Sequence, residues 1–167
     1  MPSERIDRVL AAMRARGLTQ MIVSDPQSID YLTGVYVEPF ERLFALYLSA
    51  DGKHRFFLNR LFPAPRTPIE AVWFTDTDDS IGLLAAAVRP GEALGIDKEW
   101  PARFLLPLME RLPGTPCRLA SGCVDGVRAC KDAAEQALMR ENSALNDEVM
   151  RRAAAYLKEG MTEEEGA

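Results

Sequence analysis

The chain has one histidine and three cysteines, and these small numbers limit the chemistry that it can perform by itself. A Ser-His-Asp or Cys-His nucleophile would depend on His54 alone, and no residue near it in sequence supports such a system. Cys117, Cys123 and Cys130 are odd in number and are not spaced as Cys-x-x-Cys, which argues against a disulfide framework or zinc knuckle. We expect a structural histidine, buried or half-buried reduced thiols, and a cytoplasmic location.

Long apolar runs and clustered positive charge are also missing. No apolar run approaches the ~20 residues that span a bilayer, and the opening MPSERIDRVL lacks the apolar core of a signal peptide. The net charge is −5 and no basic stripe is visible, which argues against phosphate neutralisation. We therefore expect neither nucleic acid nor membrane as a partner. A chain of 167 residues is long enough to bury a core without disulfides or metal.

Motifs that bind metals or phosphates fail on their spacing. The acidic run at 76–79 resembles a calcium loop, but the sixth and twelfth positions, where an EF-hand needs Gly and Glu, are Ile81 and Ala87. GEALGID does not have the spacing of a dinucleotide-binding turn. We therefore predict no catalytic residue and no metal ligand in this chain, and we interpret the acidic run as a loop and a helix cap.

Apolar strand-like segments alternate with helix-like segments along the first 120 residues. Ala50-Asp51-Gly52-Lys53 predicts an antiparallel hairpin with a type I′ turn, and PAPRTP at 63–68 predicts a loop outside the sheet interior. The pattern indicates an α/β fold with a mixed sheet and helices on both faces. The predicted strands are 18–23, 40–49, 54–58, 71–75, 93–97 and 117–120.

The segment from Asp132 to Lys158 predicts one long helix. Its apolar residues fall on one face, and at 1.5 Å per residue it would be about 40 Å long, so part of that face needs a partner outside the α/β unit. Thr162-Glu163-Glu164-Glu165 then has the pattern of a capping box. This box indicates either a chain cut at a domain boundary or a frayed terminus. The apolar face comprises Ala134, Leu138, Leu145, Val149 and Tyr156.

Several of these segments, taken in order, resemble one family. DPQSIDYLTG, ERLFALYL, DGK, the acidic loop and ALGID resemble the amino-terminal domain of the creatinase/prolidase family, which includes Xaa-Pro aminopeptidases and Xaa-Pro dipeptidases. KDAAEQALMRENSALNDEVMRRAAAYLKEGMTEEE resembles the linker helix and the opening of its pita-bread catalytic domain. The resemblance implies a ribonuclease-H-like α/β domain at 1–127, then a linker helix and a truncated start of the catalytic domain at 128–167. Arg128-Ala129-Cys130-Lys131 departs from the Leu-Arg that often precedes the linker Lys in relatives.

The resemblance also implies a function. The family's catalytic domain holds two divalent metals, manganese or cobalt, through two Asp, one His and two Glu, all beyond this chain. The chain is then expected to be the non-catalytic first domain of a homodimeric Xaa-Pro peptidase. Its partners would be its own catalytic domain and a peptide substrate. A creatinase-type amidinohydrolase and a free-standing binding or dimerisation module are the alternatives.

Two segments receive specific expectations from the resemblance. DPQSIDYLTG is expected to form a short helical connection, with Tyr31 and Leu32 packed inward and Gly34 permitting a turn. The loop GVYVEPFER, residues 34–42, is the candidate rim of the substrate site. Arg42 would pair with a substrate or partner carboxylate, and Tyr36 or Phe40 would wall an apolar subsite. The alternative is that this charged loop forms only a solvated edge.

Overall fold

The computed structural model describes residues 2–166, with side chains from residue 4 onward. The chain divides into two compact units, Met1–Ala129 and Cys130–Ala167. The expected end of the first domain at residue 127 falls inside helix α5 (Gly122–Ala129), two residues before this division. Over residues 2–166, no helix combines the length and the apolar character that a membrane span requires.

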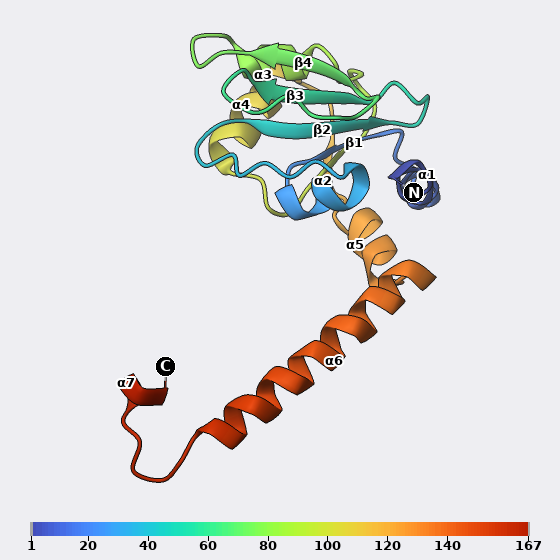
Figure 1. Cartoon of the computed structure of the whole chain (residues 1–167). Coiled ribbons are helices and arrows are strands. Elements are labelled where there is room, and N and C mark those ends of the chain that lie inside the picture. The colour runs from blue at the N-terminus through green and yellow to red at the C-terminus, as the bar shows by residue number, and fades with distance from the viewer. Residues whose placement is uncertain (1, 167) are drawn as a thin grey trace. The chain divides into compact units, whose positions relative to one another are not determined.

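The first unit contains one six-stranded sheet in the order β4-β3-β2-β1-β5-β6 (Figure 1). β2 is antiparallel to both of its neighbours, β1 and β3, and every other pair is parallel, so the predicted mixed sheet is confirmed. Because all strands except β2 run in the same direction, their carboxyl ends lie at one edge of the sheet. The strands are β1 (Gln20–Val23), β2 (Phe44–Ser49), β3 (Arg55–Asn59), β4 (Glu70–Phe74), β5 (Leu94–Ile96) and β6 (Cys117–Leu119).

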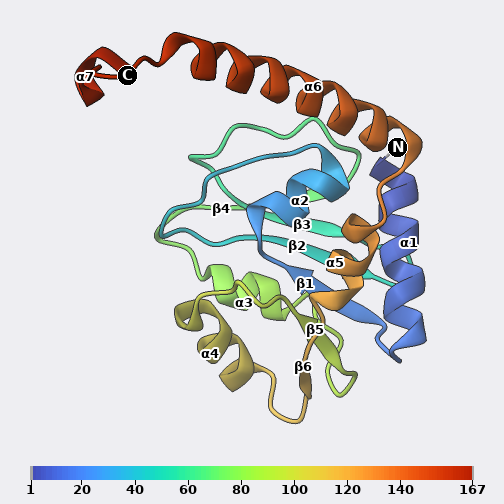
Figure 2. The ribbon, with the colours of Figure 1, turned by 90° about the horizontal axis from the view of Figure 1, so that it is seen from below.

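Helices cover both faces of this sheet, as predicted (Figure 2). The alternation along β1 shows why two cores form: Met21 and Val23 pack into one apolar cluster, and Ile22 packs into the other. The first cluster is covered by α1 (Pro2–Ala15), α2 (Pro26–Thr33) and α5, and the second by α3 (Ser80–Ala85) and α4 (Ala102–Arg111).

The segment DPQSIDYLTG forms α2 and its two caps. The Asp25 carboxylate accepts a hydrogen bond from the backbone N–H of Ser28 at 2.9 Å, which satisfies a donor in the first turn. Gly34 ends the helix in the left-handed region, with φ of 72°. Leu32 is fully buried, but Tyr31 is only half-buried. The helical connection and its glycine are therefore confirmed, and the inward packing is complete for Leu32 alone.

The connection between β2 and β3 is an antiparallel hairpin, but its turn is not type I′. That turn needs positive φ at two residues, and only Gly52 has it, at 83°. Among the described non-glycine residues only Phe40 has a positive φ, so Asp51 does not. Asp51 instead accepts a hydrogen bond from the Ser49 hydroxyl at 2.6 Å, which closes a wider loop. His54 is half-buried, and its Nδ1 accepts from the Ser49 N–H at 3.2 Å.

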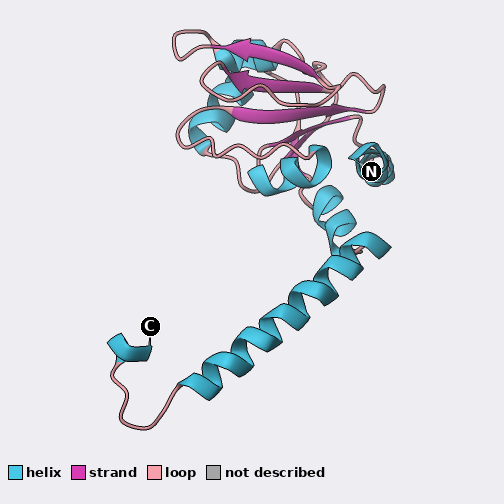
Figure 3. Ribbon diagram, viewed as in Figure 1, coloured by secondary structure: helices cyan, strands magenta, loops and turns pink. Residues whose placement is uncertain are grey.

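The connection between the parallel strands β3 and β4 contains no helix (Figure 3). Parallel neighbours usually need a crossover helix, which would cover the sheet face. Here residues 60–69 form a loop that contains Pro63, Pro65 and Pro68, as the sequence predicted. Phe62 and Ile69 of this loop pack against the first core. The loop therefore takes the place of a crossover helix on this face of the sheet.

Gln20 places a polar side chain at the start of the apolar strand β1, and it is fully buried. Its Nε2 donates to the carbonyl oxygens of Arg89 and Glu92 at 2.9 and 3.1 Å. Its Oε1 accepts from the Arg89 N–H at 2.8 Å and from the Tyr47 hydroxyl at 2.9 Å. The amide is thus fully paired, as most buried polar groups are, and it joins β1 and β2 to the turn after α3.

Gly95 lies where β5 passes close to its neighbours, and we expect Gly95→Ala to lower the free energy of unfolding by about 1–3 kcal/mol. An added Cβ would lie 2.8 Å from the Cβ of Ala120 and 3.1 Å from that of Met21, so these elements would have to move apart. Urea unfolding measures the loss. The matched control is Gly126→Ala in α5, where no atom lies within 4 Å of the added Cβ and helix propensity favours alanine. Equal losses in the two variants would contradict the packing argument.

The second unit consists mainly of α6 (Ala133–Tyr156), which begins with a capping box between Asp132 and Glu135. It is about 36 Å long at 1.5 Å per residue, and none of its residues is buried. The predicted apolar face is exposed, with Leu145 at 64%. The Thr162 box is confirmed, since the Thr162 N–H donates to Glu165 Oε2 at 2.9 Å at the start of α7 (Glu163–Gly166). Whether it marks a domain boundary stays a prediction.

The three thiols differ in burial. Cys123 is buried in α5, Cys117 is half-buried in β6, and burial raises the pKa of both thiols. Cys130 is exposed, so the expectation that all three are at least half-buried is wrong for this residue. It lies after the last turn of α5, at the start of the second unit, where no core surrounds it.

Candidate functional site

The rim loop, defined here as residues 34–42, connects α2 to β2 at the edge where the parallel strands end. In open α/β sheets ligands bind outside the carboxyl ends of the strands, so this edge is the first place to look for a site. Asn59 is the last residue of β3, and Asp76 lies two residues beyond β4. The parallel pairing of β3 with β4 brings both side chains next to Arg42.

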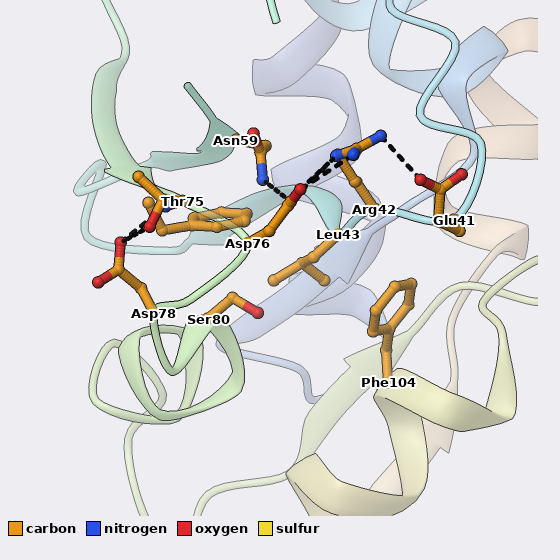
Figure 4. A pocket seen from close by; sticks show the side chains of 10 residues that line it. Glu41, Arg42, Leu43, Asn59, Thr75, Asp76, Asp78, Ser80 and Phe104 are labelled. Carbon is orange, nitrogen blue, oxygen red and sulfur yellow. Dashed lines mark hydrogen bonds and ion pairs between the residues drawn. The ribbon is translucent and has the colours of Figure 1, made fainter. Parts of the chain in front are cut away.

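Arg42 forms a forked ion pair with Asp76 (Figure 4). Its Nε donates to Oδ1 at 3.0 Å and its Nη2 donates to Oδ2 at 2.9 Å, the bidentate geometry that suits a planar guanidinium. Nη1 donates to the Glu41 carboxylate at 2.8 Å, and Asn59 Nδ2 donates to Asp76 Oδ1 at 2.7 Å. Arg42 therefore anchors the end of the rim loop to the ends of β3 and β4.

A hollow of about 230 Å³ lies beside this ion pair. Its walls carry three carboxylates, those of Glu41, Asp76 and Asp78, and a single guanidinium. Leu43 and Phe104 form an apolar wall, with Phe104 contributed by α4 (Figure 4). This charge balance favours a positively charged group over an anion. The remaining lining residues are Asn59, Phe74, Thr75 and Ser80.

Hydrogen bonds favour the charged form of two of these carboxylates, Asp76 and Asp78. The Arg42 guanidinium lowers the pKa of Asp76, and Asp76 in turn raises the pKa of Arg42. The Thr75 hydroxyl and N–H lower the pKa of Asp78. Asp76 and Asp78 are therefore ionised at neutral pH.

We expect Arg42→Ala to raise the pKa of Asp76 toward its ordinary value, because the first cause of its depression is the Arg42 hydrogen bond. A depressed carboxyl pKa contributes stability that is present above the unfolded-state value and is lost as the pH falls through the folded-state value. The wild-type protein should therefore lose this contribution only in acid, below the usual range of an aspartate. Carbon-detected NMR titration of the Asp76 carboxyl measures the shift. Arg55→Ala, which breaks a pair with Glu70 at the other end of β3, should leave it unchanged.

The other two predicted rim residues lie on the exposed surface of the loop. Tyr36 is 50% exposed and its hydroxyl donates to Glu38 at 3.1 Å, which raises the pKa of Tyr36. Phe40 is 76% exposed and has a φ of 49°, and its carbonyl oxygen accepts from Arg103 Nη2 at 3.4 Å. Neither is among the residues that line the described hollow. The structure therefore brings only Arg42 of the three to this hollow.

Three important residues of the hollow were not predicted. Asp76 was interpreted only as part of a loop, and Asn59 and Phe104 received no role. The signal for Asn59 and Asp76 was their position just at or after the ends of strands, which meet at one edge if the strands are parallel. Phe104 carried no such signal, because only the packing of α4 brings it to the hollow.

The acidic run does not form a metal site. Asp79 caps α3 by accepting from the Gly82 N–H at 3.0 Å, which confirms the loop and helix cap. Within residues 2–166, no three His, Cys, Asp or Glu side chains come together as ligands for a metal ion. The residues of this chain therefore do not fit the two-metal centre that the family resemblance implies.

Comparison with known proteins identifies the family. The model described as Creatinase/Prolidase N-terminal domain matches residues 5–130. The "Probable dipeptidase PepE" of Mycobacterium bovis is 30% identical over 169 residues, covering 96% of this chain and 45% of that protein. The crystal structure of dipeptidase PepE from Mycobacterium ulcerans has a TM-score of 0.88 and 30% identity, covering 99% of this chain and 47% of that one.

More distant structures share the fold. A crystal structure of recombinant prolidase from Thermococcus sibiricus has a TM-score of 0.84 at 24% identity and covers 100% of this chain and 47% of that one. The chain thus spans less than half the length of these relatives. The matched residues, 5–130, contain the whole sheet and all the helices that cover it except the first residues of α1. The chain belongs to the creatinase/prolidase N-terminal domain family.

Proposed function

We propose that the chain is the non-catalytic N-terminal domain of a metal-dependent Xaa-Pro peptidase. The observation that carries the proposal is the match to relatives named as dipeptidases and prolidases that are more than twice as long as the matched segment. The names of these relatives favour a peptidase over a creatinase-type amidinohydrolase. The peptide bond next to proline is the proposed point of cleavage.

The proposal includes the partners of the domain. A catalytic domain joined to this chain would hold two divalent metals, manganese or cobalt. Residues 2–166 contain no group of side chains suited to bind these metals, so no step of the reaction is assigned to them. The protein would act as a homodimer in the cytoplasm. The exposed apolar face of α6, which includes Leu138 and Val149, supports a further protein surface as its partner.

The rim loop has a specific role in this proposal. Arg42 and Asp76 fix its carboxyl-terminal end, while Phe40 and Tyr36 present aromatic rings to solvent. An exposed phenylalanine at positive φ is held in place at a cost in backbone strain, and such residues cluster at functional sites. We assign Phe40 and Tyr36 to contacts with the substrate or a partner subunit, and Arg42 to positioning the loop that carries them.

Peptidase assays on two polypeptides test the main proposal. The 167-residue chain and the longer protein encoded by its gene are each incubated with Xaa-Pro dipeptides and Mn²⁺ or Co²⁺, with creatine as the alternative substrate. We expect turnover of the dipeptides by the longer protein and none by the 167-residue chain. Turnover of creatine would favour the amidinohydrolase, and a longer protein that dimerises without hydrolysing either substrate would favour the binding module. Turnover by the 167-residue chain would contradict a non-catalytic role.

The role of the rim loop is tested in the longer protein by Arg42→Ala and Phe40→Ala. We expect both to lower kcat/KM on Xaa-Pro substrates, since displacement of a positioning element weakens transition-state binding. The matched control is Arg118→Ala on β6, an exposed arginine away from the loop. Unchanged kcat/KM on every Xaa-Pro substrate would leave the loop as a solvated edge.

A further inference from the structure

A second hollow, of about 290 Å³, lies on the sheet face that carries α1 and α2. Residues 66–69 of the loop between β3 and β4, which takes the place of a crossover helix, contribute to its walls. Ile6 of α1, Leu32 of α2 and Ile69 of the loop form apolar walls. The hollow is near the lower end of the size range of ligand pockets, which matches one small molecule.

The two charged residues that line this hollow have opposite signs. Asp7 on α1 and Arg66 on the loop are both exposed and both line it. Neither forms a hydrogen bond or ion pair with another described residue, so both charges are available to a ligand. An apolar pocket that presents one carboxylate and one guanidinium is complementary to a small molecule that carries an amine and a carboxylate.

His54 adds a neutral donor. Its Nδ1 accepts a hydrogen bond from the Ser49 N–H, so the proton of the neutral ring resides on Nε2. This nitrogen can therefore donate a hydrogen bond to a ligand. Burial is the main cause that lowers the pKa of His54, and the carboxylates of Asp51 and Asp7 act in the opposite direction. The ring is therefore neutral at neutral pH and contributes a hydrogen bond without a second positive charge.

We propose that this hollow binds a free amino acid with an aliphatic side chain. The ligand carboxylate pairs with Arg66 and accepts from His54 Nε2, the ammonium group pairs with Asp7, and the side chain packs against Ile6, Leu32 and Ile69. The site is separate from the hollow beside Arg42, with which it shares no lining residue. The proposal does not depend on the peptidase activity, because it concerns binding alone.

NMR titration of the 167-residue protein with leucine tests the proposal. We expect saturable shifts at the backbone amides of Thr67 and Ile69 and at the His54 ring. Three analogues each lack one recognised group: leucinamide lacks the carboxylate, 4-methylpentanoate lacks the amine and glycine lacks the side chain. Each should bind at least about tenfold more weakly, the scale of one lost charge-assisted or apolar contact. No saturable shift with leucine, or equal affinity for any analogue, would overturn the proposal.

Two variants test the location of the proposed binding site. Arg66→Ala should weaken leucine binding about tenfold, while Arg118→Ala should leave it unchanged. Both arginines are exposed, so neither change threatens the fold, and the dispersion of the amide spectrum verifies this. Equal affinities of the Arg66 variant and the wild-type protein would show that leucine does not bind here. Because no turnover is measured, failure of this test leaves the peptidase proposal untouched, and the reverse also holds.

Discussion

Replacing Asp97 by alanine is expected to lower the free energy of unfolding by about 3–5 kcal/mol. Asp97 follows β5 and is only 6% exposed. Its Oδ2 accepts from the backbone N–H groups of Ser24 and Asp25, both at 3.1 Å, and its Oδ1 accepts from the Ser121 hydroxyl at 3.1 Å. One carboxylate thus joins the end of β1, the end of β5 and the start of α5. Alanine would leave three donors without this acceptor in a mostly buried site.

Urea unfolding followed by circular dichroism measures this loss. Asp97→Asn keeps one acceptor oxygen but points an amide nitrogen at one set of donors, so its loss should be intermediate. The matched surface control is Asp125→Ala, which removes a half-exposed carboxylate that pairs with Lys98 and should cost less than about 1 kcal/mol. A loss as small for Asp97→Ala as for Asp125→Ala would show that the buried carboxylate does not hold these segments together.

Tyr31→Ala is expected to cost about 3 kcal/mol, at the low end of the range for large aromatic truncations, because the ring is half-buried. The ring joins three helices. The Arg5 guanidinium of α1 lies 4.2 Å from the ring centroid and its Nη1 donates to the Tyr31 carbonyl oxygen at 2.8 Å. The Tyr31 hydroxyl donates to the Val127 carbonyl oxygen of α5 at 3.5 Å. Removal of the ring would loosen α1, α2 and α5 together.

Tyr31→Phe separates the ring from the hydroxyl. The ring and its cation–π contact are kept, and only one long hydrogen bond is lost, so the cost should be below about 1 kcal/mol. Both variants are measured by the same urea titration. If Tyr31→Ala also costs less than 1 kcal/mol, the ring is a surface group and its packing role is refuted.

The strands and their order along the chain were predictable because each is a short apolar segment bounded by turn residues, but the strand predicted at 40–49 begins only at Phe44. The cap of α3 and the capping box of α7 were predicted for a similar reason, since Asp79 and Thr162 act on backbone groups three residues away. The type I′ turn was wrong because the pattern Asp-Gly does not reveal that Asp51 is held by Ser49 in a wider loop. The partial exposure of Tyr31 depends on Arg5 and α5, which are distant in sequence.

Only the part of the candidate site that belongs to the rim loop was predictable from the sequence. The rim loop and Arg42 were predicted from a family resemblance, whereas the partner of Arg42 lies 34 residues away. Asp76 reaches Arg42 because β4 pairs in parallel with β3 on the far side of β2, and nothing in the local sequence distinguishes that arrangement from an antiparallel one. Arg42 was expected to pair with a substrate or partner carboxylate, and that expectation remains a prediction.

The buried amide of Gln20 has a consequence for how the central strand finds its place. Gln20 is followed by Met21, Ile22 and Val23, which are apolar on both faces, so hydrophobic alternation alone would tolerate a one-residue slip of this strand. A one-residue slip would separate the Gln20 amide from the carbonyl and N–H groups of Arg89. The amide would then be buried without hydrogen-bond partners. In the observed alignment of β1 the amide of this glutamine is fully hydrogen-bonded, so one buried polar side chain favours that alignment over a slipped one.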